Sequence, residues 1–86
     1  MAKSKEEKLE IMKSVLNKLD DVHNTQQSLI EKLGLIQVEL FDIQSPDLDK
    51  ELEKVMDTAN ETIDIIHQAQ ENFEIKYNAL NLGANS

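Results

Sequence analysis

Several residue types that usually shape a small domain are scarce or missing in this 86-residue chain. It contains no cysteine, no tryptophan and no arginine, and only two glycines, one proline and one tyrosine. Without cysteine the chain can form neither disulfides nor thiolate metal sites. With so few glycines and prolines, little of the sequence can break or turn the backbone. The scarcity predicts a few long helices rather than many short elements.

The charge is one-sided as well. Asp and Glu number 17 against nine lysines, which gives a net charge of −8. Direct binding of nucleic acid is not expected, because it requires a basic patch and arginine is the most common reader of bases and phosphates. An acidic surface suits solubility, a basic partner, or mimicry of a phosphate backbone. The arginine-free, lysine- and asparagine-rich composition is typical of AT-rich genomes such as those of phages and mobile elements.

Long apolar runs are also lacking. No stretch approaches the ~20 apolar residues of a membrane-spanning helix, and the charged residues 1–10 are not followed by the hydrophobic region of a signal peptide. We therefore expect a cytoplasmic protein without membrane contact. A chain of this length has room for one domain, residues 1–86, and buries only ~60% of the surface that its unfolded form exposes. Association with another chain is the expected source of extra stability.

Two segments, about 4–44 and 46–82, carry apolar residues at alternating steps of three and four, the heptad spacing of helices that pack along one stripe. The first set consists of Met12, Val15, Leu19, Val22, Gln26, Leu29, Leu33, Ile36, Leu40 and Ile43. The second consists of Leu52, Met56, Ala59, Ile63, Ile66, Gln70, Phe73, Tyr77 and Leu80. Each set contains one glutamine.

The residues between the two segments predict a tight turn at 45–46. Ser45 suits a helix N-cap, Pro46 the first helical turn, and Asp47 the positive end of the helix dipole. A turn this short forces the helices, each ~55 Å long at 1.5 Å per residue, to lie antiparallel. Gly83 is expected to end the second helix, with 83–86 as a frayed tail. The expected fold is all-α: an antiparallel, coiled-coil-like two-helix hairpin that dimerises into a four-helix bundle.

One stretch also fits a different structure. Residues 36–40 alternate between apolar and polar side chains as a strand does, and Gly34 precedes them. A strand or a helix break at 34–40 is therefore an open alternative. A continuous helix is preferred, because the heptad spacing runs through this stretch without a shift.

The string Asp-x-x-His-x-x-Gln occurs twice, 44 residues apart. The copies consist of Asp20, His23 and Gln26 and of Asp64, His67 and Gln70. In a hairpin that turns at 45–46, residue i faces roughly residue 91 − i, which sets His23 against His67 near the centre. The preferred interpretation is a polar central layer of His23, Gln26, His67 and Gln70 that fixes register. Histidines exposed on the flank, or a metal site completed by Asp20 and Asp64, are the alternatives.

No pattern points to catalysis. Glu39-x-x-Asp42 and Glu61-x-x-Asp64 resemble the acidic pairs of all-α nucleotide hydrolases, but such pairs must converge on one magnesium site. In the hairpin Glu39 faces roughly residue 52, far from Glu61. We expect no enzymatic activity, no cofactor, no bound metal and no small-molecule substrate.

Apolar residues outside the two heptad sets predict a surface for another protein. They are Leu9, Leu16 and Ile30 beside the first set, Leu48, Val55 and Ala69 beside the second, and Leu35, Val38 and Phe41 near the turn. The two flanking groups are expected on different sides of the hairpin, which leaves two separate apolar strips uncovered. Packing within a twisted hairpin is the alternative explanation.

These features favour a non-enzymatic protein–protein interaction module, a homo-oligomeric acidic hairpin that acts as a small adaptor or regulator. Its expected partners are a second copy of itself and an unidentified protein. One alternative is an inhibitor that mimics nucleic acid at the basic site of a DNA- or RNA-binding protein. The carboxylates that form a partial row for such mimicry are Asp42, Asp49, Glu53, Asp57, Asp64 and Glu71. A metal-binding helical bundle is the other alternative.

Overall fold

The computed structural model of the chain describes residues 3–83. They form two α-helices, α1 (Lys5–Ile43, 39 residues) and α2 (Pro46–Asn81, 36 residues), and no strand occurs among them. The all-α, two-helix architecture predicted from the heptad spacing is confirmed, and each helix bound lies within one residue of the expected one. Of the expected C-terminal tail, residues 84–86 lie outside the described residues.

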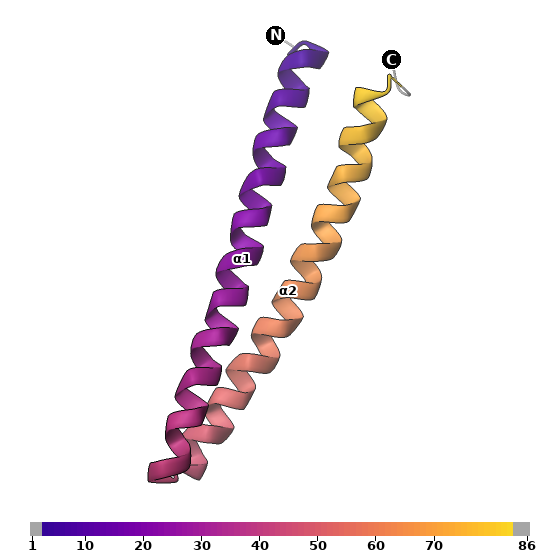
Figure 1. The fold of residues 1–86 in the computed structure, drawn as a ribbon. Helices are drawn as coiled ribbons and strands as arrows, with labels where there is room; N and C mark the ends of the chain where they lie inside the picture. The colour runs from indigo at the N-terminus through magenta and orange to yellow at the C-terminus, as the bar shows by residue number, and fades with distance from the viewer. Residues whose placement is uncertain (1–2, 84–86) are drawn as a thin grey trace.

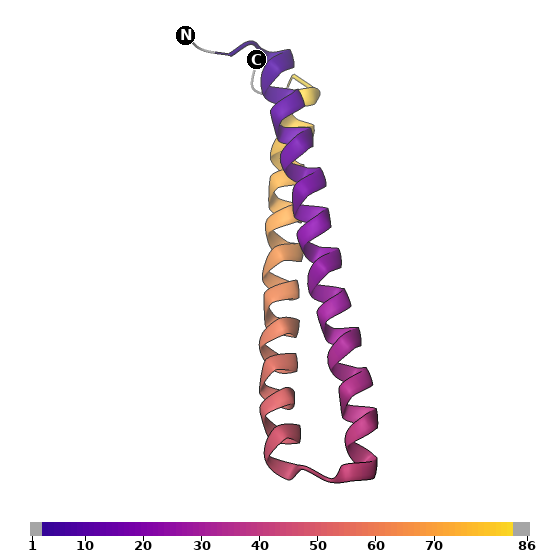
Figure 2. The ribbon, with the colours of Figure 1, turned by 90° about the vertical axis from the view of Figure 1, so that its left-hand side faces the viewer.

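The two helices lie antiparallel and are joined at one end by Gln44 and Ser45 (Figure 1). In Figure 1 they overlap at the turn and stand apart at the termini, and in the perpendicular view of Figure 2 the reverse holds, so the helices wind around each other. The hairpin measures 61 × 21 × 15 Å, and its radius of gyration is 19.1 Å. A compact domain of this length would have a radius of about 12 Å. The hairpin is therefore a rod in which every residue lies near the surface.

The start of α1 is fixed by a side-chain cap. The Ser4 hydroxyl accepts a hydrogen bond from the Glu7 backbone N–H at 3.1 Å and donates one to the Glu7 carboxylate at 3.0 Å. The sequence Ser-x-x-Glu is the signature of such a cap and was readable from the sequence alone. It satisfies one of the amide groups that a helix N-terminus leaves without an intrahelical partner.

We expect Ser4→Ala to lower the free energy of unfolding by about 1 kcal/mol, because the substitution removes this cap. Ser14→Ala is the matched control, since Ser14 lies exposed inside α1, beyond its first two turns, and alanine is the best helix former. Thermal unfolding followed by circular dichroism measures both. Equal losses in the two variants would show that the cap contributes nothing.

The turn relies on backbone conformation more than on capping side chains. Gln44 takes the left-handed conformation (φ 46°), and its N–H donates to the Leu40 carbonyl at 2.8 Å. Ser45 stands at the N-cap of α2, but its hydroxyl makes no capping hydrogen bond, so the expected side-chain cap is wrong. Its carbonyl instead accepts the Asp49 N–H at 2.9 Å. At the other end, Gly83 adopts a positive φ of 75° just after α2, as expected of a residue that ends a helix.

The stretch around Gly34 is helical throughout, so the strand and the helix break considered for residues 34–40 are wrong. A Cβ added at Gly34 would meet no atom within 4 Å. Packing within the hairpin therefore does not require a glycine at this position.

Residues spaced seven apart form stripes along α1, and two neighbouring stripes face α2. One of these two stripes is the expected one, and the other is not. The central stripe of α1 is buried or half-buried as expected and consists of Met12, Leu19, Gln26, Leu33 and Leu40. The second row toward α2 is the inner stripe, all half-buried: Leu9, Leu16, His23, Ile30 and Gln37. The row expected there instead remains exposed and forms the outer stripe: Val15, Val22, Leu29, Ile36 and Ile43. On α2 the buried and half-buried positions include the whole expected heptad set.

Contact between the helices is thin. Among the described residues, the side chains that count as buried are Leu33, Leu40 and Ala59. No hydrogen bond or ion pair joins a residue of α1 to a residue of α2. The helices are therefore held together by the packing of partly exposed apolar side chains, a weak source of stability for a chain of this size.

Candidate interaction surfaces

Compared with the expected orientation, α1 is rotated about its own axis by one stripe. Its outer stripe and the exposed flank of α2 therefore lie on the same side of the hairpin. In an antiparallel pair, equivalent flanking heptad positions of the two helices lie together, and the outer stripe is equivalent to Leu48, Val55, Thr62 and Ala69. A hollow of about 290 Å³ shows this directly, because Leu29, Val55 and Thr62 line it together. The prediction of two apolar strips on different sides is therefore wrong. We call the outer stripe together with Leu48, Val55, Thr62 and Ala69 the apolar face.

Three residues that the sequence placed on the partner surface belong elsewhere. Leu9, Leu16 and Ile30 form part of the inner stripe and are half-buried, because α1 turns this side toward α2. The other residues expected on that surface are exposed: Leu35 (68%), Val38 (63%), Phe41 (79%), Leu48 (39%), Val55 (43%) and Ala69.

The apolar face is more hydrophobic than the row that α1 presents to α2. All five residues of the outer stripe are aliphatic, whereas the inner stripe contains His23 and Gln37. Four outer-stripe residues are 37–44% exposed, and Ile43, at the turn, is 71% exposed. Thr62 adds little polarity, since its hydroxyl is already bonded to the Thr58 carbonyl at 2.9 Å. The sequence alone shows a stripe without any polar residue and predicts that it lies between the helices, but the structure leaves it exposed.

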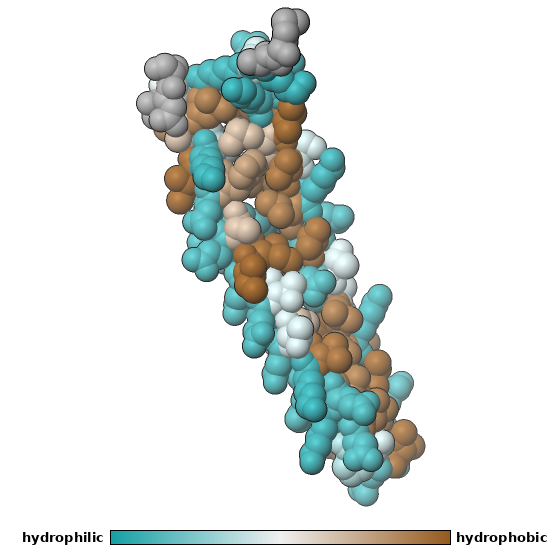
Figure 3. All heavy atoms as spheres, turned by 180° about the vertical axis from the view of Figure 1, so that it is seen from behind, coloured by the Kyte–Doolittle hydropathy of each residue, from teal (hydrophilic) through white to brown (hydrophobic). Residues whose placement is uncertain are grey.

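Hydrophobic side chains run along the length of the rod, with hydrophilic ones at their margins, on the side seen in Figure 3. The chain exposes 6795 Å² in total. A compact monomer of the same 9.8 kDa would expose roughly 5,200 Å². The hairpin thus exposes about 1,600 Å² more than a compact monomer of its mass.

The centre of the hairpin brings the two histidines together. The ring centroids of His23 and His67 lie 6.4 Å apart with the ring planes tilted by 48°. The Nε2 atom of His67 also lies 3.0 Å from Oε1 of Glu71, one turn further along α2, and both side chains are more than 60% exposed. The histidines therefore meet across the hairpin, with His23 half-buried and His67 open to solvent.

The two glutamines of the expected polar layer are not joined to the histidines. Gln26 and Gln70 are half-buried in the contact between the helices, and neither side chain makes a hydrogen bond to another described residue. No buried side-chain nitrogen or oxygen in the described part of the chain lacks a partner. The side chains of Gln26 and Gln70 thus interrupt the apolar contact between the helices without forming a hydrogen-bonded network.

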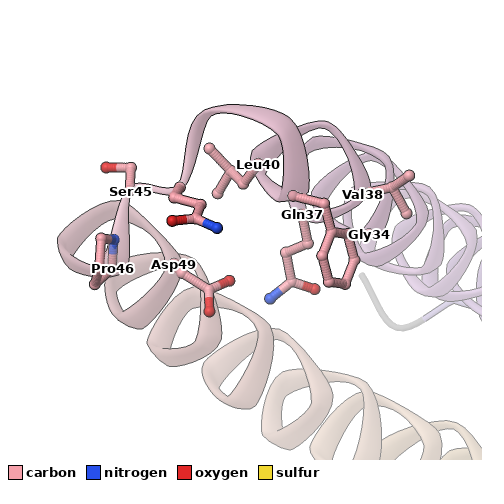
Figure 4. Close-up of a pocket in the computed structure, with 9 residues that line it drawn as sticks. Gly34, Gln37, Val38, Leu40, Ser45, Pro46 and Asp49 are labelled. Carbon is pink, nitrogen blue, oxygen red and sulfur yellow. The ribbon is translucent and has the colours of Figure 1, made fainter.

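The end of the rod near the turn differs from the rest in charge and in shape. Residues 35–53, which we call the turn end, contain six of the 17 carboxylates and one of the nine lysines, a net charge of −5. An open hollow of about 600 Å³ lies there between the helices (Figure 4). Its lining consists of Gly34, Gln37, Val38, Leu40, Phe41, Gln44, Ser45, Pro46 and Asp49. The sequence predicts the apolar surroundings of the turn. The negative charge of residues 35–53 is not among its predictions, although a count of charged residues along the sequence would have revealed it.

No family model, curated protein or solved structure matches the chain. Within residues 3–83, no three histidine or acidic side chains are grouped so that they could hold a metal ion. Neither helix, as far as the chain is described, has an apolar stretch long enough to cross a bilayer.

Proposed function

We propose that the protein is a non-enzymatic interaction module in which two hairpins pair through their apolar faces and form a four-helix bundle. The observation that carries the proposal is the position of the outer stripe. The hairpin turns a stripe with two polar residues toward α2 and leaves an entirely aliphatic stripe on its surface. Apolar faces of this length on soluble proteins are usually covered by a partner.

The exposed area supports a second copy as that partner. Permanent homodimers bury roughly 1,000–2,500 Å² of each chain, and the hairpin exposes about 1,600 Å² beyond a compact monomer. A second hairpin offers an apolar face of the same length, so the two faces can cover each other completely. In the bundle the central stripe of α1 would become the interior, with the inner stripe toward α2 and the outer stripe toward the second copy.

Charge favours an antiparallel arrangement of the two copies. The turn end carries −5, whereas residues 3–18, at the other end of the rod, carry five lysines and three carboxylates. Placing the turn end of one copy beside the termini of the other brings opposite charges together, and a parallel pair would set two turn ends side by side.

Sedimentation equilibrium at micromolar concentration tests the proposal. We expect a mass of about twice 9.8 kDa and a melting temperature that rises with protein concentration, because dissociation accompanies unfolding. A monomer whose melting temperature does not depend on concentration would contradict the proposed function.

A further inference from the structure

We infer that the turn end is a docking site for a basic amphipathic helix of a second protein. The inference rests on the proposed function for the position of the second copy and adds the chemistry of the other partner. Gly34 and Phe41 flank the central stripe on the side opposite the outer stripe, since each directly follows a central-stripe residue, Leu33 or Leu40. A second copy on the apolar face therefore leaves the hollow at the turn end uncovered.

Three large apolar side chains near the turn are mostly exposed to solvent, and they contribute little to the packing of the hairpin. Leu35, Val38 and Phe41 are 63–79% exposed within two turns of α1. Phe41 is one of three aromatic residues in the chain and lines the hollow. Val38, labelled in Figure 4, also lines it. Aromatic residues, phenylalanine among them, are enriched at protein interfaces relative to the rest of the surface.

Gly34 supplies space in the hollow. A glycine inside a helix costs about 0.5–1 kcal/mol relative to alanine, yet the space next to Gly34 is open and a Cβ there would touch nothing within 4 Å. The glycine therefore destabilises the helix, and no side chain of the hairpin fills the space beside it. A side chain from a partner can occupy that room and pack against the backbone of α1.

Charge identifies the chemistry of the partner. The turn end carries −5 of the total −8, Asp49 lies in the lining of the hollow, and the last turn of α1 has no basic residue to offset the negative end of its dipole. A partner that covers the apolar residues would lie close to these carboxylates. Charge complementarity therefore requires lysines or arginines beside its apolar side chains. An amphipathic helix with an apolar stripe and a basic flank meets both requirements, and an open hollow between two helices suits it.

The probe for this inference is a synthetic helix of about 18 residues with leucines on one face and lysines on the other. Titrated into the ¹⁵N-labelled full chain, it should shift the amide signals of Gly34, Val38, Phe41 and Asp49 and leave those near the termini unchanged. The same peptide with glutamate in place of lysine should not bind. Equal binding of both peptides, or shifts spread over all acidic residues of the rod, would overturn the inference.

Two variants locate the site. Phe41→Ser removes the exposed aromatic ring, and Gly34→Leu fills the hollow; each should weaken peptide binding about tenfold or more. Ile75→Ser is the matched control, because Ile75 is 66% exposed in the half of α2 near the termini, and it should bind the peptide as the unaltered chain does. Unchanged binding in both turn-end variants would show that the contact is only electrostatic and refute the site.

Sedimentation of the same variants separates this inference from the proposed function. Phe41→Ser and Gly34→Leu should keep the mass of the unaltered protein, with melting temperatures equal or higher for Gly34→Leu, since leucine is the better helix former. A change of mass in Phe41→Ser would assign Phe41 and the hollow beside it to contacts between copies and overturn the docking site. A monomeric unaltered protein that still binds the basic peptide at the turn end would refute the proposed dimer and leave the docking site in place.

Discussion

Replacing Leu29 and Ile36 together with aspartate is expected to convert the dimer into a monomer of low helix content. Both residues lie in the middle of the outer stripe and are 37% and 41% exposed in the single hairpin. The second copy would bury both aspartates without a partner, and an unpaired buried charge costs several kcal/mol. With four such charges per dimer, the dissociation constant should rise by about a thousandfold or more. Sedimentation equilibrium gives the mass, and circular dichroism at the same concentration gives the helix content.

The matched control introduces the same two negative charges outside the apolar face. Gln68 and Ile75 are both exposed and lie one heptad apart on the side of α2 that points away from α1 and from the apolar face. Gln68→Asp together with Ile75→Asp should therefore keep the dimer mass and the helix content. If the control pair dissociated as completely as the pair in the outer stripe, net charge and not the apolar face would govern assembly.

Replacing Gln26 and Gln70 with leucine is the second change expected to have a large effect, in this case stabilising. Both side chains are half-buried between the helices and make no hydrogen bond to another described residue. Leucine at these positions would add apolar burial where an amide now has to stay hydrated, for a gain of roughly 2 kcal/mol in total. For a chain of this size that corresponds to about 10 °C in melting temperature.

Loss of specificity should accompany this gain. A single polar residue within an apolar heptad restricts register and oligomeric state, so the double leucine variant should populate more than one mass in sedimentation. Gln27→Leu together with Gln68→Leu changes the composition identically at exposed positions and should alter the melting temperature by a much smaller amount. Equal stabilisation by both pairs would show that Gln26 and Gln70 have no special place in the contact.

The helices and their pairing could be predicted because they depend on local features of the sequence. The heptad spacing, Pro46 and the scarcity of glycine determine two long helices and a short turn. A short turn leaves antiparallel pairing as the only arrangement, and from this the facing of His23 and His67 follows, whose rings lie 6.4 Å apart. This facing follows from chain direction and helix rise alone.

The rotation of α1 about its axis could not be predicted in the same way. Three stripes of this helix have heptad spacing, and any two adjacent ones can face α2. Ranking by hydrophobicity selects Val22 over its neighbour His23 and Ile36 over Gln37, but the hairpin makes the opposite choice. The choice depends on the conformation of the turn, with Gln44 in the left-handed region, and on the side chains of α2. A ranking of the stripes of α1 by hydrophobicity takes account of neither the turn conformation nor the side chains of α2.

This rotation also decides where the candidate surface lies. It moves Leu9, Leu16 and Ile30 toward α2, and it brings the exposed apolar residues of both helices to one side. A sequence pattern gives the stripes of each helix separately, whereas the combined face exists only once the two helices are placed together. The hollow above Gly34 is likewise a property of the pair, since the sequence shows a glycine but not the empty space beside it.

The central claim, that a second copy covers the apolar face, is tested most directly by methyl NMR on a dimer mixed from isotope-labelled and unlabelled chains. Isotope-filtered spectra of such a sample contain only contacts between copies. We predict cross-peaks from the methyl groups of Val22, Leu29 and Ile36, and cross-peaks between Val15 of one copy and the turn-end residues Ile43 or Leu48 of the other. A spectrum without contacts between copies, or with contacts confined to residues outside the apolar face, would contradict the account.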